Sequence, residues 1–196
     1  MIPVHNPIRK PAPFDQRCGI PGSTWLVANP TSKKMPAYWT RFQPELADGF
    51  FNRCGWWAMW IADGPVDHFL SRNNHRHLAY CWDNYRYIAG TVNSSKKDLD
   101  DQVLDPFEIQ DGWFEVLLPS MQLVPTPALP PSLAAKAAFT LKKLHLQNGA
   151  KVRRCRLKWY EAYKAGHLSM AGLEDFAPLV ATAVEKWQTA SLLPLP

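Results

Sequence analysis

The fold is decided by residues 66–97, which read VDHFLSRNNHRHLAYCWDNYRYIAGTVNSSKK. A short apolar strand ends at Asp67 and His68, and the polar, basic run that follows predicts an exposed loop. A short aromatic segment then carries Asn84. Asn93 opens a polar, proline-free segment with Lys96 and Lys97, for which one or two helical turns are expected. The stretch therefore predicts a strand, a loop, an aromatic segment and a short helix.

The polar residues of this stretch are suited to hydrolysing a phosphodiester. That reaction needs a base for the attacking water and a divalent cation that neutralises charge on the phosphate. His68 is the natural base, because a histidine can hold an acceptor nitrogen near neutral pH. Asp67 and the side-chain carbonyl of Asn93 offer the hard oxygen ligands that Mg²⁺ or Mn²⁺ prefers. Since adjacent strand residues face opposite sides, Asp67 and His68 reach one phosphate only if the strand bends or ends there.

With these residues the chain resembles the HNH endonucleases, also called the ββα-metal or His-Me finger family. In that family an Asp-His pair, a central Asn and a final His or Asn lie on a hairpin and the helix after it. The spacing from Asn84 to Asn93 and the wording VDHFL…WDNY…NSSK are similar to its bacterial members. The resemblance covers residues 54 to about 165. It implies an α+β fold with a ββα-metal core, in which Asn84 orders the loop through backbone hydrogen bonds.

The resemblance also implies an activity and partners. The expected protein is a cytoplasmic, metal-dependent DNA endonuclease that uses one Mg²⁺ or Mn²⁺ and leaves a 5′-phosphate and a 3′-hydroxyl. Residues 137–165 are similar to the C-terminal region of HNH proteins encoded beside an ATPase in bacterial defence operons. An ATPase-like protein partner and a role in antiviral defence or restriction are therefore expected.

Basic residues near the motif are candidates for contacting nucleic acid. If the segment after Asn93 is helical, Lys96 and Lys97 share its face and can bind a flanking phosphate. Arg72, Arg76 and Arg86 either contact the nucleic-acid backbone or are ordinary solvated charges, and the sequence favours neither. A further basic stripe is interpreted as a solvated helix face: Lys151, Arg154 and Lys158.

Structural zinc is not expected. Many relatives carry two C-x-x-C pairs around the motif, but here only Cys54 remains of the first, and Ala89 and Val92 take the positions of the second. Aromatic packing is expected to replace the metal, through Trp56, Trp57, Trp60 and Trp82. A separate zinc cluster of Cys54, His75, His77 and Cys81 is the alternative, but a solvated loop with a buried thiol is favoured.

The composition divides the chain into three parts. It has 196 residues with 18 Pro and 9 Trp, and eight of the prolines lie in the first 44 residues, whereas none lies between Ser132 and Ala177. We therefore expect a Pro-rich wrapping arm of loop and extended chain (1–52), a nuclease core (53–125) and a helical region (126–196). Hairpins are expected about Asp63-Gly64-Pro65 and Asp111-Gly112. Helices are expected over 132–147, over 150–164, and from about 169 with an interruption at Pro178.

Charge and hydropathy narrow the classes of function. The net charge of +5 permits nucleic-acid binding without establishing it. No apolar stretch approaches the length of a membrane span, and MIPVHNPIRKPAP lacks the apolar region of a secretory signal, so no membrane partner is expected. Two alternatives stay open. One is a non-catalytic HNH-like subunit for nucleic-acid binding or assembly, and the other is a nuclease that acts on RNA.

Overall fold

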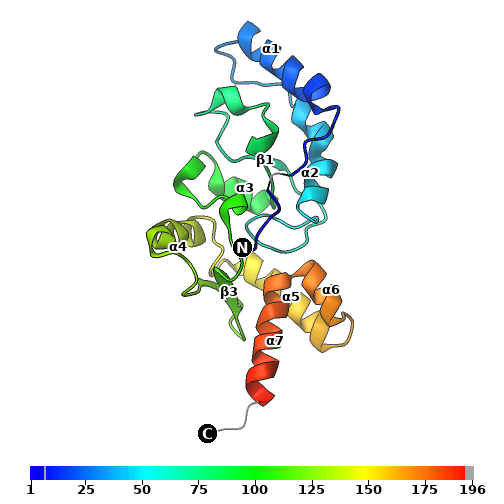
Figure 1. Cartoon of the computed structure of the whole chain (residues 1–196), viewed down its shortest axis with the longest axis vertical. Coiled ribbons are helices and arrows are strands. Elements are labelled where there is room, and N and C mark those ends of the chain that lie inside the picture. Colours follow the sequence, from blue (N-terminus) through cyan, green and yellow to red (C-terminus); the bar gives the residue numbers. More distant parts are fainter. Residues whose placement is uncertain (7, 193–196) are drawn as a thin grey trace.

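The computed structural model describes residues 1–6 and 8–192, which form an α+β fold (Figure 1). The four strands are β1 (Val66–His68), β2 (Tyr85–Tyr87), β3 (Phe114–Leu117) and β4 (Gln122–Pro125). The α-helices are α1 (Ile20–Ala28), α2 (Gln43–Gly49), α3 (Gly90–Lys96), α4 (Ala134–Lys143), α5 (Ala150–Lys164), α6 (Met170–Phe176) and α7 (Pro178–Leu192). Short helical turns join them: Asp15–Gly19, Tyr38–Phe42, Arg76–Leu78, Trp82–Asn84, Asp100–Gln102, Pro106–Glu108 and Pro131–Leu133.

The expectation of loop and extended chain for residues 1–52 is wrong in part, because helical elements cover Asp15–Ala28 and Tyr38–Gly49. Pro44 lies in the first turn of α2, where the missing N–H of proline has no helical partner to lose. Pro21 follows the π-helical turn Asp15–Gly19, which leads directly into α1. The segment packs on the first hairpin, where the ring of Phe14 lies 5.3 Å from Trp82 and 5.9 Å from Tyr85. These residues are therefore part of the core that supports β1 and β2.

The first hairpin joins β1 to β2 across the long loop 69–84, and α3 follows two residues after β2. The strands are antiparallel, with Asp67 opposite Arg86 and His68 opposite Tyr85. The predicted pairing about Asp63-Gly64-Pro65 is wrong, since residues 56–61 form turns with one bridge between Arg53 and Trp60. Gly64 lies against the backbone instead, where a Cβ atom would come within 2.7 Å of the carbonyl oxygen of Ile88.

The second hairpin pairs different strands from those predicted. Gly112 makes a turn with φ of +75°, but the residues before it form no strand. β3 pairs instead with β4, Phe114 opposite Pro125 and Leu117 opposite Gln122. The Asp-Gly pair therefore starts the hairpin rather than forming its tip.

The C-terminal helices follow their local patterns closely. α5 has the predicted bounds, and Ser169 caps α6 by accepting a hydrogen bond from Gly172 N at 3.1 Å. Pro178 begins α7. The helix expected over 132–147 is shorter and ends at Lys143, before His145 adopts a φ of +53°.

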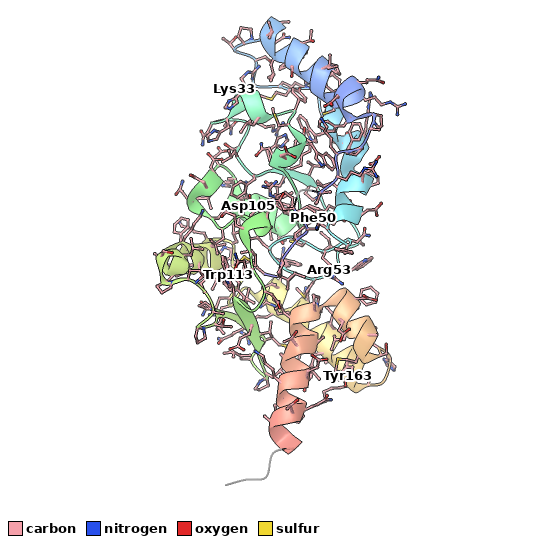
Figure 2. All side chains as sticks on the ribbon, viewed as in Figure 1. Lys33, Phe50, Arg53, Asp105, Trp113 and Tyr163 are labelled. Carbon is pink, nitrogen blue, oxygen red and sulfur yellow. The ribbon has the colours of Figure 1, made fainter. Side chains whose placement is uncertain are left out.

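The hydrophobic core crosses the boundaries expected from composition. Its largest cluster joins Cys54 and Trp56 to Leu141 and Ala183 of the C-terminal helices. Arg53, labelled in Figure 2, lies between these regions and donates to the Asp175 carbonyl at 2.8 Å. The helical region is therefore packed on the central hairpins rather than separate from them. Among the described residues, no helix combines the length and apolarity that crossing a membrane would need.

Candidate functional site

The hairpin and α3 bring five of the expected site residues to one cavity of about 460 Å³. Asp67 and His68 come from β1, Asn93 from α3, and Arg72 and Lys97 from the loops that follow these two elements. β1 ends at His68, so the two adjacent side chains can both border the cavity. Asn93, Arg72 and Lys97 are exposed, whereas Asp67 and His68 are buried.

The imidazole of His68 is held on three sides. Its Nε2 lies 2.8 Å from the carbonyl oxygen of Ala79, and its ring meets Trp39 and Tyr85 edge to face at 4.7 and 5.1 Å. Burial lowers the pKa of His68 to about 3; the bond to Ala79 opposes this change and the charges of Arg72 and Lys96 add to it. The ring is therefore neutral at physiological pH. Nε2 donates to the carbonyl, which leaves the lone pair of Nδ1 as the acceptor.

Asp67 forms a buried ion pair with Lys96, which corrects the expectation that Lys96 binds phosphate. The Lys96 side chain is fully buried and donates to the His68 carbonyl at 2.9 Å and to Asp67 Oδ1 at 3.4 Å. Asp67 Oδ2 lies 3.1 Å from the same ammonium but accepts no hydrogen bond from the described residues. Burial raises the pKa of Asp67, and the charge of Lys96 opposes this rise.

The end of α3 separates the two lysines. Lys96 is its last residue, and Lys97 turns out of the helix with φ of +45°. Lys97 is exposed and borders the cavity, while Lys96 points into the core. Of the pair, Lys97 keeps an arrangement suited to phosphate.

Asn84 ties the long loop to the start of β2. Its Oδ1 accepts from Leu70 N at 2.8 Å, and its Nδ2 donates to the carbonyls of Leu70 and Leu78 at 2.9 and 3.3 Å. Asn84 lies outside the cavity and acts through the loop backbone. Because this loop carries Arg72 and the carbonyl that holds His68, Asn84 fixes the position of both.

Asp100 is a second loop support that was not predicted from the sequence. Its carboxylate accepts from Ser71 N and from the Asn74 side chain, each at 2.6 Å, and lies 3.6 Å from His75 Nε2. Burial alone would raise the pKa of Asp100, but the hydrogen bonds together outweigh it and lower the pKa. Nothing in the acidic run DLDD distinguishes this residue from its neighbours.

Arg86 and Arg76 have structural partners, so they are not the ordinary solvated charges that the sequence left as one alternative to a nucleic-acid contact. Arg86 is buried and donates to both oxygens of Asp105, at 2.6 and 2.5 Å (Asp105 is labelled in Figure 2). Its guanidinium also covers the Phe107 ring at 3.8 Å. Arg76 is half-buried and donates to the carbonyls of Ser32 and Asn29, at 2.6 and 2.5 Å. It therefore anchors the N-terminal segment to the loop.

The cavity offers ligands that fit a hard divalent cation. Asp67 Oδ2 is a buried anionic oxygen with no hydrogen bond from the described residues, and Asn93 contributes a neutral amide oxygen. In the described part of the chain, no three His, Cys, Asp or Glu side chains are grouped to hold a metal. The donor set thus favours Mg²⁺ or Mn²⁺, with water and phosphate oxygens completing the shell, over a thiophilic metal.

Cys54 lies where the resemblance would put a zinc ligand, but its sulfur is occupied by backbone hydrogen bonds. Sγ accepts from Trp57 N at 3.4 Å and from Ala89 N at 3.2 Å. Burial raises the pKa of the thiol, so it stays protonated.

The expected group of packing tryptophans is wrong in part. Trp56 lies with Cys54 in the core, but Trp82 belongs to another cluster and Trp60 is 39% exposed.

Comparison with known proteins leaves the site to be interpreted from its own geometry. No family model, curated protein or solved structure matches the chain.

Proposed function

We propose that the protein is a metal-dependent endonuclease of the HNH type that hydrolyses phosphodiester bonds of DNA. One observation supports this most: Asp67, His68 and Asn93, from an antiparallel hairpin and the helix after it, border a single cavity. Arg72 and Lys97 border the same cavity as exposed cations, a charge that suits a phosphate.

In this mechanism His68 accepts the proton of the attacking water at Nδ1, since Nε2 is engaged with Ala79. Asp67 and Asn93 would hold the cation. When bound, Mg²⁺ or Mn²⁺ neutralises charge on the phosphate and on the leaving oxygen. Arg72 and Lys97 bind the phosphate and orient the strand. Asn84 keeps the loop, and with it the Ala79 carbonyl, at a fixed distance from the imidazole.

Cleavage of a supercoiled plasmid with Mg²⁺ or Mn²⁺ tests this function. We expect the wild type to nick or cut the plasmid and His68→Ala to lose at least about a hundredfold in rate, the scale of a general base. His77→Ala is the matched control, because His77 is exposed on the same loop and does not border the cavity. Equal residual nicking by the wild type and His68→Ala would refute the assignment as an endonuclease that uses His68. Running the same pair on single-stranded RNA separates a DNA nuclease from an RNA nuclease.

A second candidate is a non-catalytic subunit that binds nucleic acid or assembles with a larger partner. The Lys96 ammonium, 3.1 Å from Asp67 Oδ2, favours it, because a cation already neutralises the expected metal ligand. Mn²⁺ titration with duplex DNA present distinguishes the two, using His68→Ala so that the DNA stays intact. Binding of Mn²⁺ that is lost in the His68→Ala/Asp67→Asn double variant supports the nuclease. Intact DNA binding without such a cation site supports the second candidate.

A further inference from the structure

Two further cavities continue from the candidate site along α5. One of about 430 Å³ lies between α3 and the start of α5, and it shares Ser94 with the cavity that holds Asp67 and His68. The next, of about 620 Å³, lies between residues 57–63 and the middle of α5, and it shares Trp57 with the first. The three cavities are therefore neighbours: the cavity that holds Asp67 and His68 comes first, the one between α3 and the start of α5 second, and the one at the middle of α5 third.

The basic stripe of α5 borders both of these cavities. Lys151 lines the first, and Arg154 and Lys158 line the second. All three are exposed, and Lys151 and Arg154 form no ion pair with another described residue. Lys158 pairs with Glu161 at 2.8 Å on the surface, and Asp63 is the acidic residue that lines the second cavity. The stripe is the solvated helix face that the sequence predicted, and the positive residues that line the two cavities outnumber the acidic one.

Aromatic rings face the same cavities. Trp57, Trp60 and Trp159 line the second cavity, and Trp57 also lines the first. Trp60 is 39% exposed and meets Phe176 edge to face at 5.7 Å. Aromatic faces beside cations are what an unpaired nucleic-acid strand uses, because its bases are free to stack. A duplex keeps its bases stacked on one another.

We propose that these two cavities form a groove that binds single-stranded DNA leading to or from the catalytic cavity. The strand's phosphates lie along Lys151, Arg154 and Lys158, and its bases stack on Trp60 and Trp57. Residues 151 to 158 advance about 10 Å along the helix axis, so the three cations are spread along the groove. The inference rests on the proposed function and adds to it a site for an unpaired strand beside the cavity, but the binding it describes requires no cleavage.

Fluorescence anisotropy with a labelled oligodeoxythymidine of about twelve nucleotides, in EDTA, tests the groove. The variant Lys151→Gln/Arg154→Gln/Lys158→Gln should bind at least tenfold more weakly, and the slope of log K against log salt should fall by about 2. Trp60→Ala should weaken binding about tenfold and leave the salt slope unchanged. A duplex of the same length should bind more weakly than the single strand and should be insensitive to Trp60→Ala.

The matched control is Lys33→Gln/Lys34→Gln/Lys142→Gln, which removes the same charge from exposed sites that line neither cavity. It should bind within about twofold of the wild type. All variants change exposed residues, and unchanged circular dichroism and melting temperature will show that they fold. Equal weakening by the two triple variants, or tighter binding of the duplex, overturns the groove. Because EDTA prevents cleavage, that result is independent of whether His68 proves catalytic.

Discussion

The buried pair of Lys96 and Asp67 gives the most quantitative prediction of the structure. Lys96→Met keeps the length and apolar volume of the side chain but removes its ammonium. Asp67 then stays buried without a counter-charge, and the His68 carbonyl loses the donor 2.9 Å away. Removing one partner of a buried pair costs about 3–5 kcal/mol. We therefore expect Lys96→Met to lower the free energy of unfolding by about that amount at neutral pH.

The pH dependence of this loss has a definite sign. Burial raises the pKa of Asp67 in the folded protein, and Lys96 opposes that rise, so removing Lys96 raises this pKa further. A carboxyl with a raised folded pKa favours folding while it is protonated and disfavours folding as the pH rises through that pKa. The loss caused by Lys96→Met should therefore be small below the usual carboxyl pKa of about 4 and should grow as the pH rises through the raised pKa of Asp67.

Urea denaturation followed by tryptophan fluorescence measures the effect. Lys97→Met is the matched control, because Lys97 is the exposed neighbour, and it should change stability by no more than about 0.5 kcal/mol. Asp67→Asn combined with Lys96→Met should recover much of the loss, since the buried charge is then absent. If Lys96→Met and Lys97→Met were equally stable, the buried ion pair would be refuted.

Three further perturbations probe the supports of the site. The folded pKa of His68, about 3, lies below its unfolded value of 6.5, so the unfolded chain takes up the proton first. Stability should fall by at most about 1.4 kcal/mol per pH unit below 6.5, and His68→Phe should remove that slope in urea titrations at pH 7 and pH 5. Arg86→Met should cost about 3–5 kcal/mol in the same assay, because it leaves Asp105 buried and unpaired, and adding Asp105→Asn should restore part of it. Asn84→Ala should cost about 1–3 kcal/mol and speed the hydrogen exchange of the Leu70 amide that it binds, whereas unchanged exchange would show that the loop is held elsewhere.

Local signals predicted the C-terminal helices well. The apolar spacing of Val152, Cys155, Trp159 and Tyr163 defines a buried face of α5, and the structure packs these residues in one cluster. The Ser169 cap and the proline that starts α7 are likewise encoded within a few residues. Helix periods and caps depend on neighbours in sequence, so they can be read without knowledge of the fold.

Pairings between distant segments could not be predicted in this way. Residues 56–61 have the apolar composition of a strand, yet β1 pairs with β2, because burying Tyr85 and Tyr87 against the N-terminal helices favours that partner. Arg86 donates a hydrogen bond to Asp105, 19 residues later in the chain, and no rule of sequence spacing predicts this pair. The N-terminal helices were missed because their prolines were taken to indicate loop, although Pro44 occupies a first turn, where proline is accepted, and Pro21 follows a π-helical turn.

The side chains of the candidate site could be predicted from the motif, whereas the backbone groups that contact them could not. Asp67, His68 and Asn93 were singled out by residue type and order, and the fold places them at one cavity. The carbonyl of Ala79, which selects the free nitrogen of His68, leaves no trace in the sequence because every residue has one. The role of Lys96 was predicted wrongly because the direction of its side chain depends on where α3 ends. Lys96 is the last residue of the helix and is buried, whereas the next residue, Lys97, is exposed.

The position of Lys96 also bears on how a cation would enter the cavity. The protein supplies one carboxylate, already facing an ammonium 3.1 Å away, and a neutral amide, so its ligands carry almost no net negative charge. A divalent cation is bound weakly by such a set, since its affinity depends on the charge of its ligands. The phosphate brings the missing negative charge and further oxygens. If the protein is a nuclease, the cation would therefore bind together with DNA. In the free protein, burial keeps His68 uncharged, and the ammonium of Lys96 balances the charge of Asp67.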